Sequence, residues 1–262
     1  TPLSLILGPA DDLFEDPSLP SPLKSKMELI KRNSNRLLKL MEQLMDFRRV
    51  QSGKMELKVQ QVQLFNFFYD FYLSFLPLAE KKQINFHFNP NFKEKEGWID
   101  PKHVEKIIMN LLSNAFKYAS TGKNIFFEPE IDKTGKIIKI TIKDQGNGIS
   151  KDNISKVFER FSNAKNDQIY KVDSSGIGLS LTRDLTHLHK GQISVKNSFP
   201  NGSIFSVTLP IDEGAYTVEE KHITTLLEHG PENRANQIKE DSVIFNSEKL
   251  EGLPSASAVK NK

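Results

Sequence analysis

Residues 101–119 of this chain read PKHVEKIIMNLLSNAFKYA. Successive residues of a helix are turned by about 100°, and at that spacing the large apolar side chains of the stretch fall on one broad face. Asp100 directly before it is a typical helix cap. The stretch therefore predicts an amphipathic helix. Along its opposite side runs a narrow polar stripe formed by Lys106, Asn110, Asn114 and Lys117.

The polar stripe has the residue types of a metal and phosphate site. Asn110 and Asn114 lie one helical turn apart, and their amides can ligate a metal ion without adding charge. A magnesium ion bound to triphosphate already has anionic ligands, so neutral amides can complete its shell while Lys117 meets the phosphates. The solvated face of any amphipathic helix has a similar composition, so the stripe needs a second motif.

That second motif is Asp144-Gln-Gly146-Asn-Gly148, which comes directly after a strand-like run ending at Ile142. A carboxylate at a strand end can accept a hydrogen bond from the exocyclic amine of adenine. Gly146 and Gly148 leave room for the backbone to approach the base. An ordinary turn can carry the same residues, so this stretch alone leaves both readings open.

A third motif, Gly176-Ile177-Gly178-Leu179, opens a predicted helix that runs to about His189. Glycines and free N–H groups at a helix N-terminus suit phosphate groups. Each motif is weak alone, but their order along the chain favours a nucleotide site.

The three motifs resemble the nucleotide-binding boxes of sensor histidine kinases. Residues 110–118 are similar to the N box, residues 144–148 to the G1 box and residues 176–179 to the G2 box. Phe158-Glu-Arg-Phe161 resembles the F box, and Gly202-Ser-Ile-Phe205 the glycine turn before the last strand. The resemblance covers residues 1 to about 210, and it implies a protein histidine kinase that binds ATP and Mg²⁺.

The resemblance also implies roles for single residues. Asn114 would be the direct Mg²⁺ ligand, Asn110 a nearby or water-mediated one, and Asp144 would hold adenine. Asn110 and Lys117 would act in catalysis, and residues 161–175 would form a lid over ATP. The implied nucleotide contacts are Asn110, Asn114, Lys117, Tyr118, Asp144, Gly146, Gly148, Ile149, Phe158, Gly176, Ile177, Gly178 and Leu179.

The first 54 residues are predicted to form a helical hairpin. A sevenfold apolar repeat predicts that the second helix carries a coiled-coil or bundle seam, formed by Leu23, Ile30, Leu37 and Leu44. Two helices cannot enclose a core, so we expect a homodimeric four-helix bundle. This hairpin fits the dimerisation and phosphotransfer domain of the resembled family.

From Met55 the apolar period changes to two, which indicates β-strands interrupted by helices. Residues 55–212 are therefore predicted to form a catalytic domain of mixed sheet with helices on one face. The predicted fold class is α+β, a helical hairpin followed by an α/β sandwich of the histidine kinase, chaperone and topoisomerase type. Residues 213–262 are predicted to be a charged linker or an unstructured tail, with one weak helix near residues 218–228.

In the resembled family the first helix carries the pattern His-Glu-x-x-Thr-Pro-Leu, and this chain begins at Thr1-Pro-Leu. We therefore expect the phosphorylated histidine just upstream of Thr1, and the six histidines present to be structural or on the surface. Thr1 itself occupies the family's position for a phosphatase role. The implied partner is a response-regulator receiver domain, which would lie in the same polypeptide if the chain comes from a hybrid sensor.

Two rival functions remain open. The first is an ATPase that hydrolyses ATP, as related chaperones, topoisomerases and mismatch-repair proteins do with a glutamate general base four residues before the metal-binding asparagine. Here that position is Asn110, whose amide cannot take a proton from water at neutral pH. Slow hydrolysis and phosphoryl transfer to a protein are therefore favoured. The second rival is a catalytically silent dimeric scaffold that binds nucleotide.

The composition argues against several other classes. The 262 residues include no cysteine, so disulfides and thiolate metal sites are excluded and a reducing cytoplasm is expected. No apolar run is long enough for a membrane helix, although the resemblance implies a full-length protein anchored in the inner membrane. Residues 1–210 carry a net charge of +7 and residues 211–262 a net charge of −4, which sum to +3. The basic surplus is compatible with polyphosphate ligands or nucleic acid, but it is spread along the chain, which favours a solvated surface. We expect no nucleic-acid partner.

Overall fold

The computed structural model describes residues 4–15, 19–160, 176–198 and 201–221. The chain divides into two compact units, with the division between Met41 and Glu42. Among the described residues, no helix is both long and apolar enough to span a membrane.

The first unit contains helix α1 and the first part of helix α2. Helix α1 covers Ser4–Glu15 and helix α2 covers Ser21–Gln51, so α2 continues into the second unit. Within the first unit, the ammonium groups of Lys24 and Lys31 lie 5.3 and 5.7 Å from the ring centre of Phe14, which joins the two helices.

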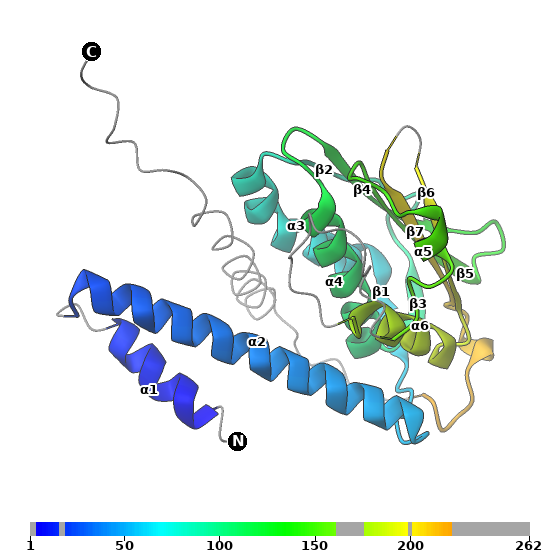
Figure 1. Cartoon of the computed structure of the whole chain (residues 1–262). Helices are drawn as coiled ribbons and strands as arrows, with labels where there is room; N and C mark the ends of the chain where they lie inside the picture. The colour runs from blue at the N-terminus through cyan, green and yellow to red at the C-terminus, as the bar shows by residue number, and fades with distance from the viewer. Residues whose placement is uncertain (1–3, 16–18, 161–175, 199–200, 222–262) are drawn as a thin grey trace, which may run out of the picture. The chain divides into compact units, whose positions relative to one another are not determined.

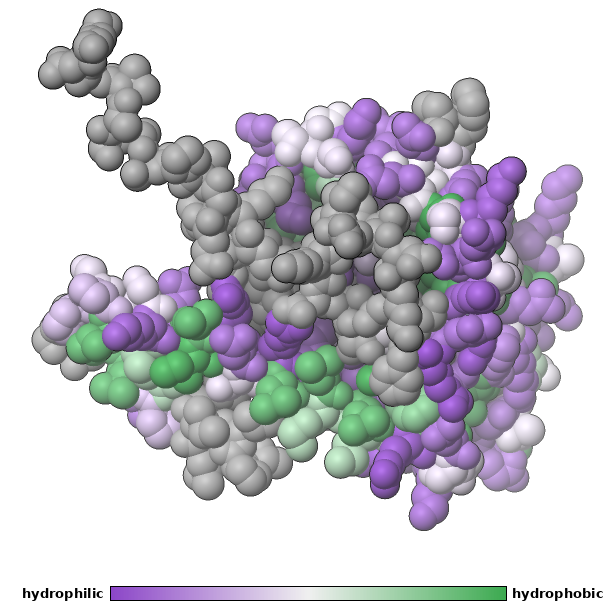
Figure 2. Space-filling view, viewed as in Figure 1, coloured by the Kyte–Doolittle hydropathy of each residue, from purple (hydrophilic) through white to green (hydrophobic). Residues whose placement is uncertain are grey.

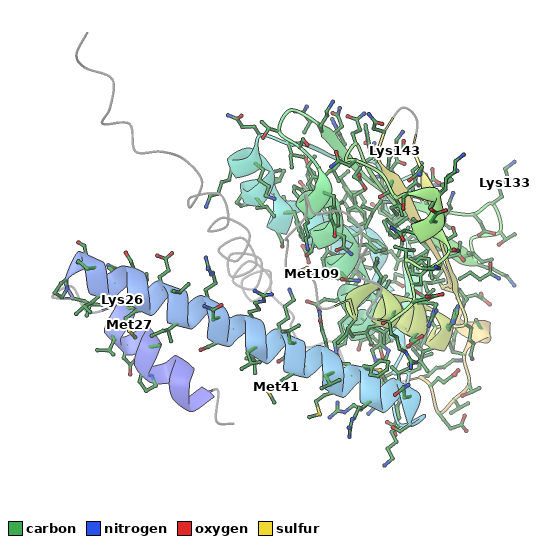
Figure 3. All side chains as sticks on the ribbon, viewed as in Figure 1. Lys26, Met27, Met41, Met109, Lys133 and Lys143 are labelled. Atoms are coloured by element: carbon green, nitrogen blue, oxygen red, sulfur yellow. The ribbon has the colours of Figure 1, made fainter. Side chains whose placement is uncertain are left out.

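Among the residues that the structure describes, helix α2 has no buried side chain. The predicted seam residues Leu23, Ile30, Leu37 and Leu44 are between 43 and 49% exposed. Figure 2 shows hydrophobic side chains gathered along this helix, and Figure 3 labels Met27 and Met41 on it. The seam is thus an apolar stripe without a covering partner among the described residues.

The second unit is built on a five-stranded mixed sheet in the order β2-β4-β5-β7-β6. The two strands at one edge, β2 and β4, are parallel and the other neighbours are antiparallel. The strands are β2 Asn85–Phe88, β4 Asn124–Ile131, β5 Ile137–Asp144, β6 Gln192–Asn197 and β7 Ser203–Pro210. A short second sheet pairs β1 (Gln60–Gln63) with β3 (Glu96–Ile99).

Three helices cover one face of the five-stranded sheet (Figure 1). They are α3 Leu64–Lys82, α4 Pro101–Tyr118 and α6 Gly178–Leu188. The aromatic side of α3 supplies much of the core, because Phe68 packs edge-on against Phe127 of β4 and Phe75 stacks on Phe116 of α4. The predicted α+β class, with a mixed sheet and helices on one face, is confirmed.

The β4–β5 connection is a hairpin turn around Thr134. Asp132 accepts hydrogen bonds from Thr134 Oγ1 and from the backbone N–H groups of Lys136 and Ile137. These bonds hold the pKa of Asp132 below its usual value. Gly135 has a φ of +70°, which a glycine adopts without steric cost.

Packing against the second unit continues beyond residue 212, the predicted end of the domain. Helix η1 (Glu213–Ala215) follows directly, and Tyr216 is buried with its hydroxyl donating to Pro210 O at 2.6 Å. Lys221 then forms a parallel bridge with Val59. The packed domain therefore continues to Lys221, and residues 218–220 form a turn where a helix was expected. Residues 222–262 lie outside the described residues.

The amino-terminal boundary of the sheet also differs from the prediction. Residues 55–58 alternate like a strand but have no strand partner, and pairing begins at Val59 and Gln60. Leu57 and Val59 instead bury their side chains in a small cluster with Tyr216. The apolar alternation thus arises because Leu57 and Val59 face this cluster, and residues 55–58 do not belong to a sheet.

Candidate functional site

Helix α4 carries the polar stripe predicted from the sequence. Asp100 caps it by accepting hydrogen bonds from the N–H groups of Lys102 and His103 at 3.0 and 3.2 Å. Its apolar face is buried, whereas Asn110 and Asn114 are only partly buried. Buried on that face are Val104, Ile107, Ile108, Leu111, Leu112, Ala115 and Phe116.

The two lysines of the stripe differ in their surroundings. Lys106 forms an ion pair with Asp46 near the end of α2, within the second unit. Lys117 lies over the ring of Tyr118, with its ammonium group 5.4 Å from the ring centre, and Tyr118 is 42% exposed. Lys117 and Tyr118 thus lie side by side at the exposed end of α4.

Asp144 ends strand β5 and is only 4% exposed. Its Oδ1 accepts from the N–H groups of Gly146 at 2.8 Å and Ser203 at 3.3 Å, and its Oδ2 accepts from Ser203 Oγ at 2.5 Å. A carboxylate has about four acceptor positions. Three are therefore used within the protein, and about one remains for a donor from outside.

The glycines after Asp144 are required by their surroundings. A Cβ on Gly146 would lie 2.6 Å from Tyr118 O, so only glycine allows the loop to approach the end of α4. Gly148 has a φ of +74°. The next residue, Ile149, is held at both backbone groups by the amide of Asn197, at 2.8 and 2.7 Å.

The start of α6 meets the polar stripe of α4. Gly176 has a φ of +64°, and Ile177 precedes the first helical residue, Gly178. A Cβ on Gly178 would overlap Oδ1 of Asn110, so the missing side chain lets the two helices meet here. Asn110 Nδ2 donates to Thr182 Oγ1 at 2.7 Å, which joins the predicted N and G2 boxes directly.

The remaining predicted site residues are only partly placed. Leu179 lies in the first turn of α6 and is half-buried. Phe158 is half-buried and packs edge-on against Phe205 of β7, with the ring centres 6.3 Å apart. Thr1 and the predicted lid, residues 161–175, lie outside the described residues.

A hollow of about 180 Å³ lies beside the predicted adenine position. It shares Gly146 with that position but includes neither Asp144 nor the asparagines of α4. Its wall is formed by Ser120, Lys123, Gln145, Gly146, Asn147 and Asn201. We therefore take Asp144 and the two helices, not this hollow, as the centre of the site. Figure 3 labels Met109 and Lys143, the chain neighbours of Asn110 and Asp144.

At the other end of α4 a buried histidine pair supports the helix cap. His189 Nε2 accepts from the N–H of Asp100 at 3.1 Å, and its Nδ1 lies 3.3 Å from Leu185 O. Burial lowers the pKa of His189 to about 4, against smaller opposing effects such as the Asp100 charge. Burial also lowers the pKa of His103, whose Nδ1 is 3.3 Å from Asp100 Oδ2 without forming a hydrogen bond. Both imidazole rings are thus uncharged at neutral pH and support the start of α4.

Sequence reasoning missed three polar residues of the site: Thr182, Asn197 and Ser203. Their partners are far away in sequence, so no local motif could reveal them. Ser203 follows Gly202, which was recognised only as part of a turn. Gly202 is needed there because a Cβ would overlap the backbone oxygen of Asp144.

Comparison with known proteins shows what this chain resembles. The family model for the histidine kinase-, DNA gyrase B-, and HSP90-like ATPases matches residues 99–213. Histidine kinase P4 of Formosa agariphila is 33% identical over 217 residues, which are 82% of this chain and 16% of that protein. Hybrid signal transduction histidine kinase D of Dictyostelium discoideum is 30% identical over 236 residues, 86% of this chain and 15% of that protein.

Two solved structures share the fold. The full-length ShkA structure in complex with AMPPNP has a TM-score of 0.68 at 21% identity, covering 80% of this chain and 43% of that one. The histidine kinase ThkA in complex with the response regulator protein TrrA has a TM-score of 0.58 at 20% identity, covering 81% and 58%.

The chain spans less than a quarter of the length of these two sequence relatives. The matched residues 99–213 contain both asparagines of α4, Asp144 and the glycines at the start of α6. Residues 99–213 thus match the family of the histidine kinase-, DNA gyrase B-, and HSP90-like ATPases, and the relatives of the chain are sensor and hybrid histidine kinases.

Proposed function

We propose that this chain is the kinase core of a two-component sensor histidine kinase and binds ATP together with Mg²⁺. The observation that carries the proposal is the buried carboxylate of Asp144, which keeps about one acceptor position beyond its bonds to Gly146 and Ser203. The exocyclic amine of adenine would occupy that position. ShkA, which shares this fold, was solved in complex with the ATP analogue AMPPNP, and this supports a nucleotide ligand for the fold.

The residues of α4 fit a magnesium ion that arrives with a polyphosphate. In the described ranges, no group of three or more His, Cys, Asp or Glu side chains could hold a metal ion. The amide oxygens of Asn114 and Asn110 would instead complete a shell supplied mainly by phosphate oxygens. Bound Mg²⁺ would neutralise phosphate charge, while Lys117 would hold the phosphates and the first turn of α6 would offer its N–H groups.

Replacing Asp144 by Asn tests the adenine assignment. One acceptor oxygen would become a donor facing the adenine amine, so we expect ATP affinity to fall roughly 10- to 150-fold. Guanine presents an acceptor at the same position, so the ratio of ATP to GTP affinity should shift towards GTP. Isothermal titration calorimetry measures both affinities.

Asp152→Asn is the matched control, because Asp152 is an exposed carboxylate on the short helix α5 (Lys151–Ile154). This variant should bind both nucleotides like the wild type. An unchanged ATP to GTP ratio in Asp144→Asn would refute the adenine assignment, whatever the stability of the variant.

For the reaction itself, we propose transfer of the γ-phosphoryl group to a histidine just upstream of Thr1, and then to a response-regulator aspartate. In support, Asn110 stands where related ATPases have their general base, and its amide is engaged by Thr182. The ThkA–TrrA complex and the hybrid relative support a receiver domain as the partner.

Incubation with γ-labelled ATP distinguishes this reaction from a silent scaffold. We expect acid-labile label on the full-length protein, loss of that label when the upstream histidine is changed to Gln, and no label on residues 1–262 alone. Label on residues 1–262 would mean that another histidine is the acceptor. A full-length protein that binds ATP but takes up no label would favour the scaffold.

A further inference from the structure

Thr182 lies on α6 facing Asn110 and is only 1% exposed. Its hydroxyl donates to the backbone oxygen of Gly178, one turn earlier, at 3.0 Å. The same hydroxyl accepts from Asn110 Nδ2 at 2.7 Å. It is therefore a two-way link between α6 and the polar stripe of α4.

The direction of these two bonds fixes the orientation of the Asn110 amide. A hydroxyl has a single proton, and Thr182 uses it on Gly178 O, so towards Asn110 it can act only as an acceptor. The NH₂ group of Asn110 must then face Thr182. Its Oδ1 lies on the other side, against Gly178, where any methyl group would overlap it.

We propose that Thr182 is a positioning residue, which holds the amide oxygen of Asn110 at the first turn of α6 for the metal–polyphosphate part of the ligand. The inference rests on the proposed function, because it concerns the Mg²⁺-dependent share of nucleotide binding. Without the Thr182 acceptor, the Asn110 amide would be free to rotate and its oxygen would no longer be held at this position.

The same helix contains a matched control. Thr186, one turn after Thr182, is fully buried and donates to Thr182 O at 2.7 Å, so it makes the same kind of bond to its own helix. Replacing either threonine by Val removes a buried hydroxyl and keeps the shape of the side chain. Only the change at Thr182 also removes the acceptor of Asn110.

Calorimetric titration of ATP with Mg²⁺ and with EDTA tests the proposal. We expect Thr182→Val to reduce the affinity gained from Mg²⁺ by about 5- to 30-fold, with affinity in EDTA within about twofold of wild type. Thr182→Ser should restore the gain, and Thr186→Val should keep it. Equal losses in Thr182→Val and Thr186→Val would show a merely structural effect and overturn the proposal.

A second measurement needs no ligand and so separates this inference from the proposed function. In NMR spectra of the wild type, the side-chain N–H of Asn110 that faces Thr182 should exchange slowly with solvent; its assignment comes from its loss in Asn110→Ala. Thr182→Val should speed that exchange, whereas Thr186→Val should not. Unchanged exchange in Thr182→Val overturns the positioning role, while absent ATP binding in the wild type refutes the proposed function alone.

Discussion

At the scale of single residues, His189 links folding to pH. It is fully buried, accepts from the N–H of Asp100, and has a pKa lowered from 6.5 to about 4 by burial. Between pH 4 and pH 6.5 the unfolded chain therefore binds more protons at His189 than the folded chain does. The contribution of the uncharged His189 to stability is complete above pH 6.5 and is lost as the pH falls towards 4. The neighbouring His103 acts in the same direction.

We expect the free energy of unfolding of the second unit to fall by about 2 kcal/mol between pH 7 and pH 4.5 through His189. His189→Gln should reduce this dependence, even if the variant is less stable throughout. Urea unfolding at the two pH values measures the effect, and equal pH dependence in His189→Gln and wild type would contradict it.

Single residues also show where sequence reasoning stops. Asp144 and its glycines could be predicted because a carboxylate, a strand end and two small residues follow one another along the chain. Thr182 could not, because its hydroxyl meets Asn110 across 72 residues of sequence. Short polar residues are common on helices, and only the packing of α6 on α4 shows which of them faces the site.

At the scale of elements, the segment after β7 behaves as part of the domain. Tyr216 is buried against Leu57 and Val59, and Lys190 pairs with Glu220 at 2.6 Å. Since removal of a large buried ring typically costs 3–5 kcal/mol, we expect Tyr216→Ala to destabilise the second unit by about 3 kcal/mol. Tyr216→Phe loses only the hydroxyl bond to Pro210 and should cost about 1 kcal/mol.

Chemical denaturation of these variants measures the role of the segment. Val218→Ala is the control from the same segment, because Val218 is 79% exposed and its truncation should change stability by less than about 0.5 kcal/mol. If Tyr216→Ala were as stable as Val218→Ala, the segment would not contribute to the folded domain.

Elements with a long, regular pattern were the predictable ones. Helix α4 begins at its expected residue and ends one residue before its expected limit, because it has a continuous apolar face and Asp100 caps it. The short strands β1 and β3 have four residues each, which is too few for a clear period. The segment after residue 210 has few apolar residues, and its packing depends on the distant Val59.

At the scale of the whole molecule, the apolar stripe of α2 favours association of two copies of the chain. Ile30 and Leu37 are 44 and 49% exposed, and a sevenfold repeat of such residues matches a helical-bundle seam. We expect the chain to be a dimer and the double variant Ile30→Gln with Leu37→Gln to be largely monomeric. Light scattering coupled to gel filtration reports the mass.

Glu28→Gln provides the matched control for the dimer, since Glu28 is exposed and about 180° around the helix from Leu37. It introduces the same side chain off the stripe and should leave the dimer intact. A wild-type chain that is monomeric at high micromolar concentration would contradict the prediction.

The contact of residues 211–221 with β3 has a spectroscopic consequence. Trp98 is the only tryptophan of the chain, donates its backbone N–H to Ile211 O at 2.9 Å and packs against the cluster of Leu57, Val59 and Tyr216. The Lys221 ammonium group lies 5.6 Å from the centre of its ring. Intrinsic tryptophan fluorescence therefore reports on the surroundings of Trp98 alone. A red shift of its emission would signal detachment of residues 211–221, even where circular dichroism still shows an intact sheet.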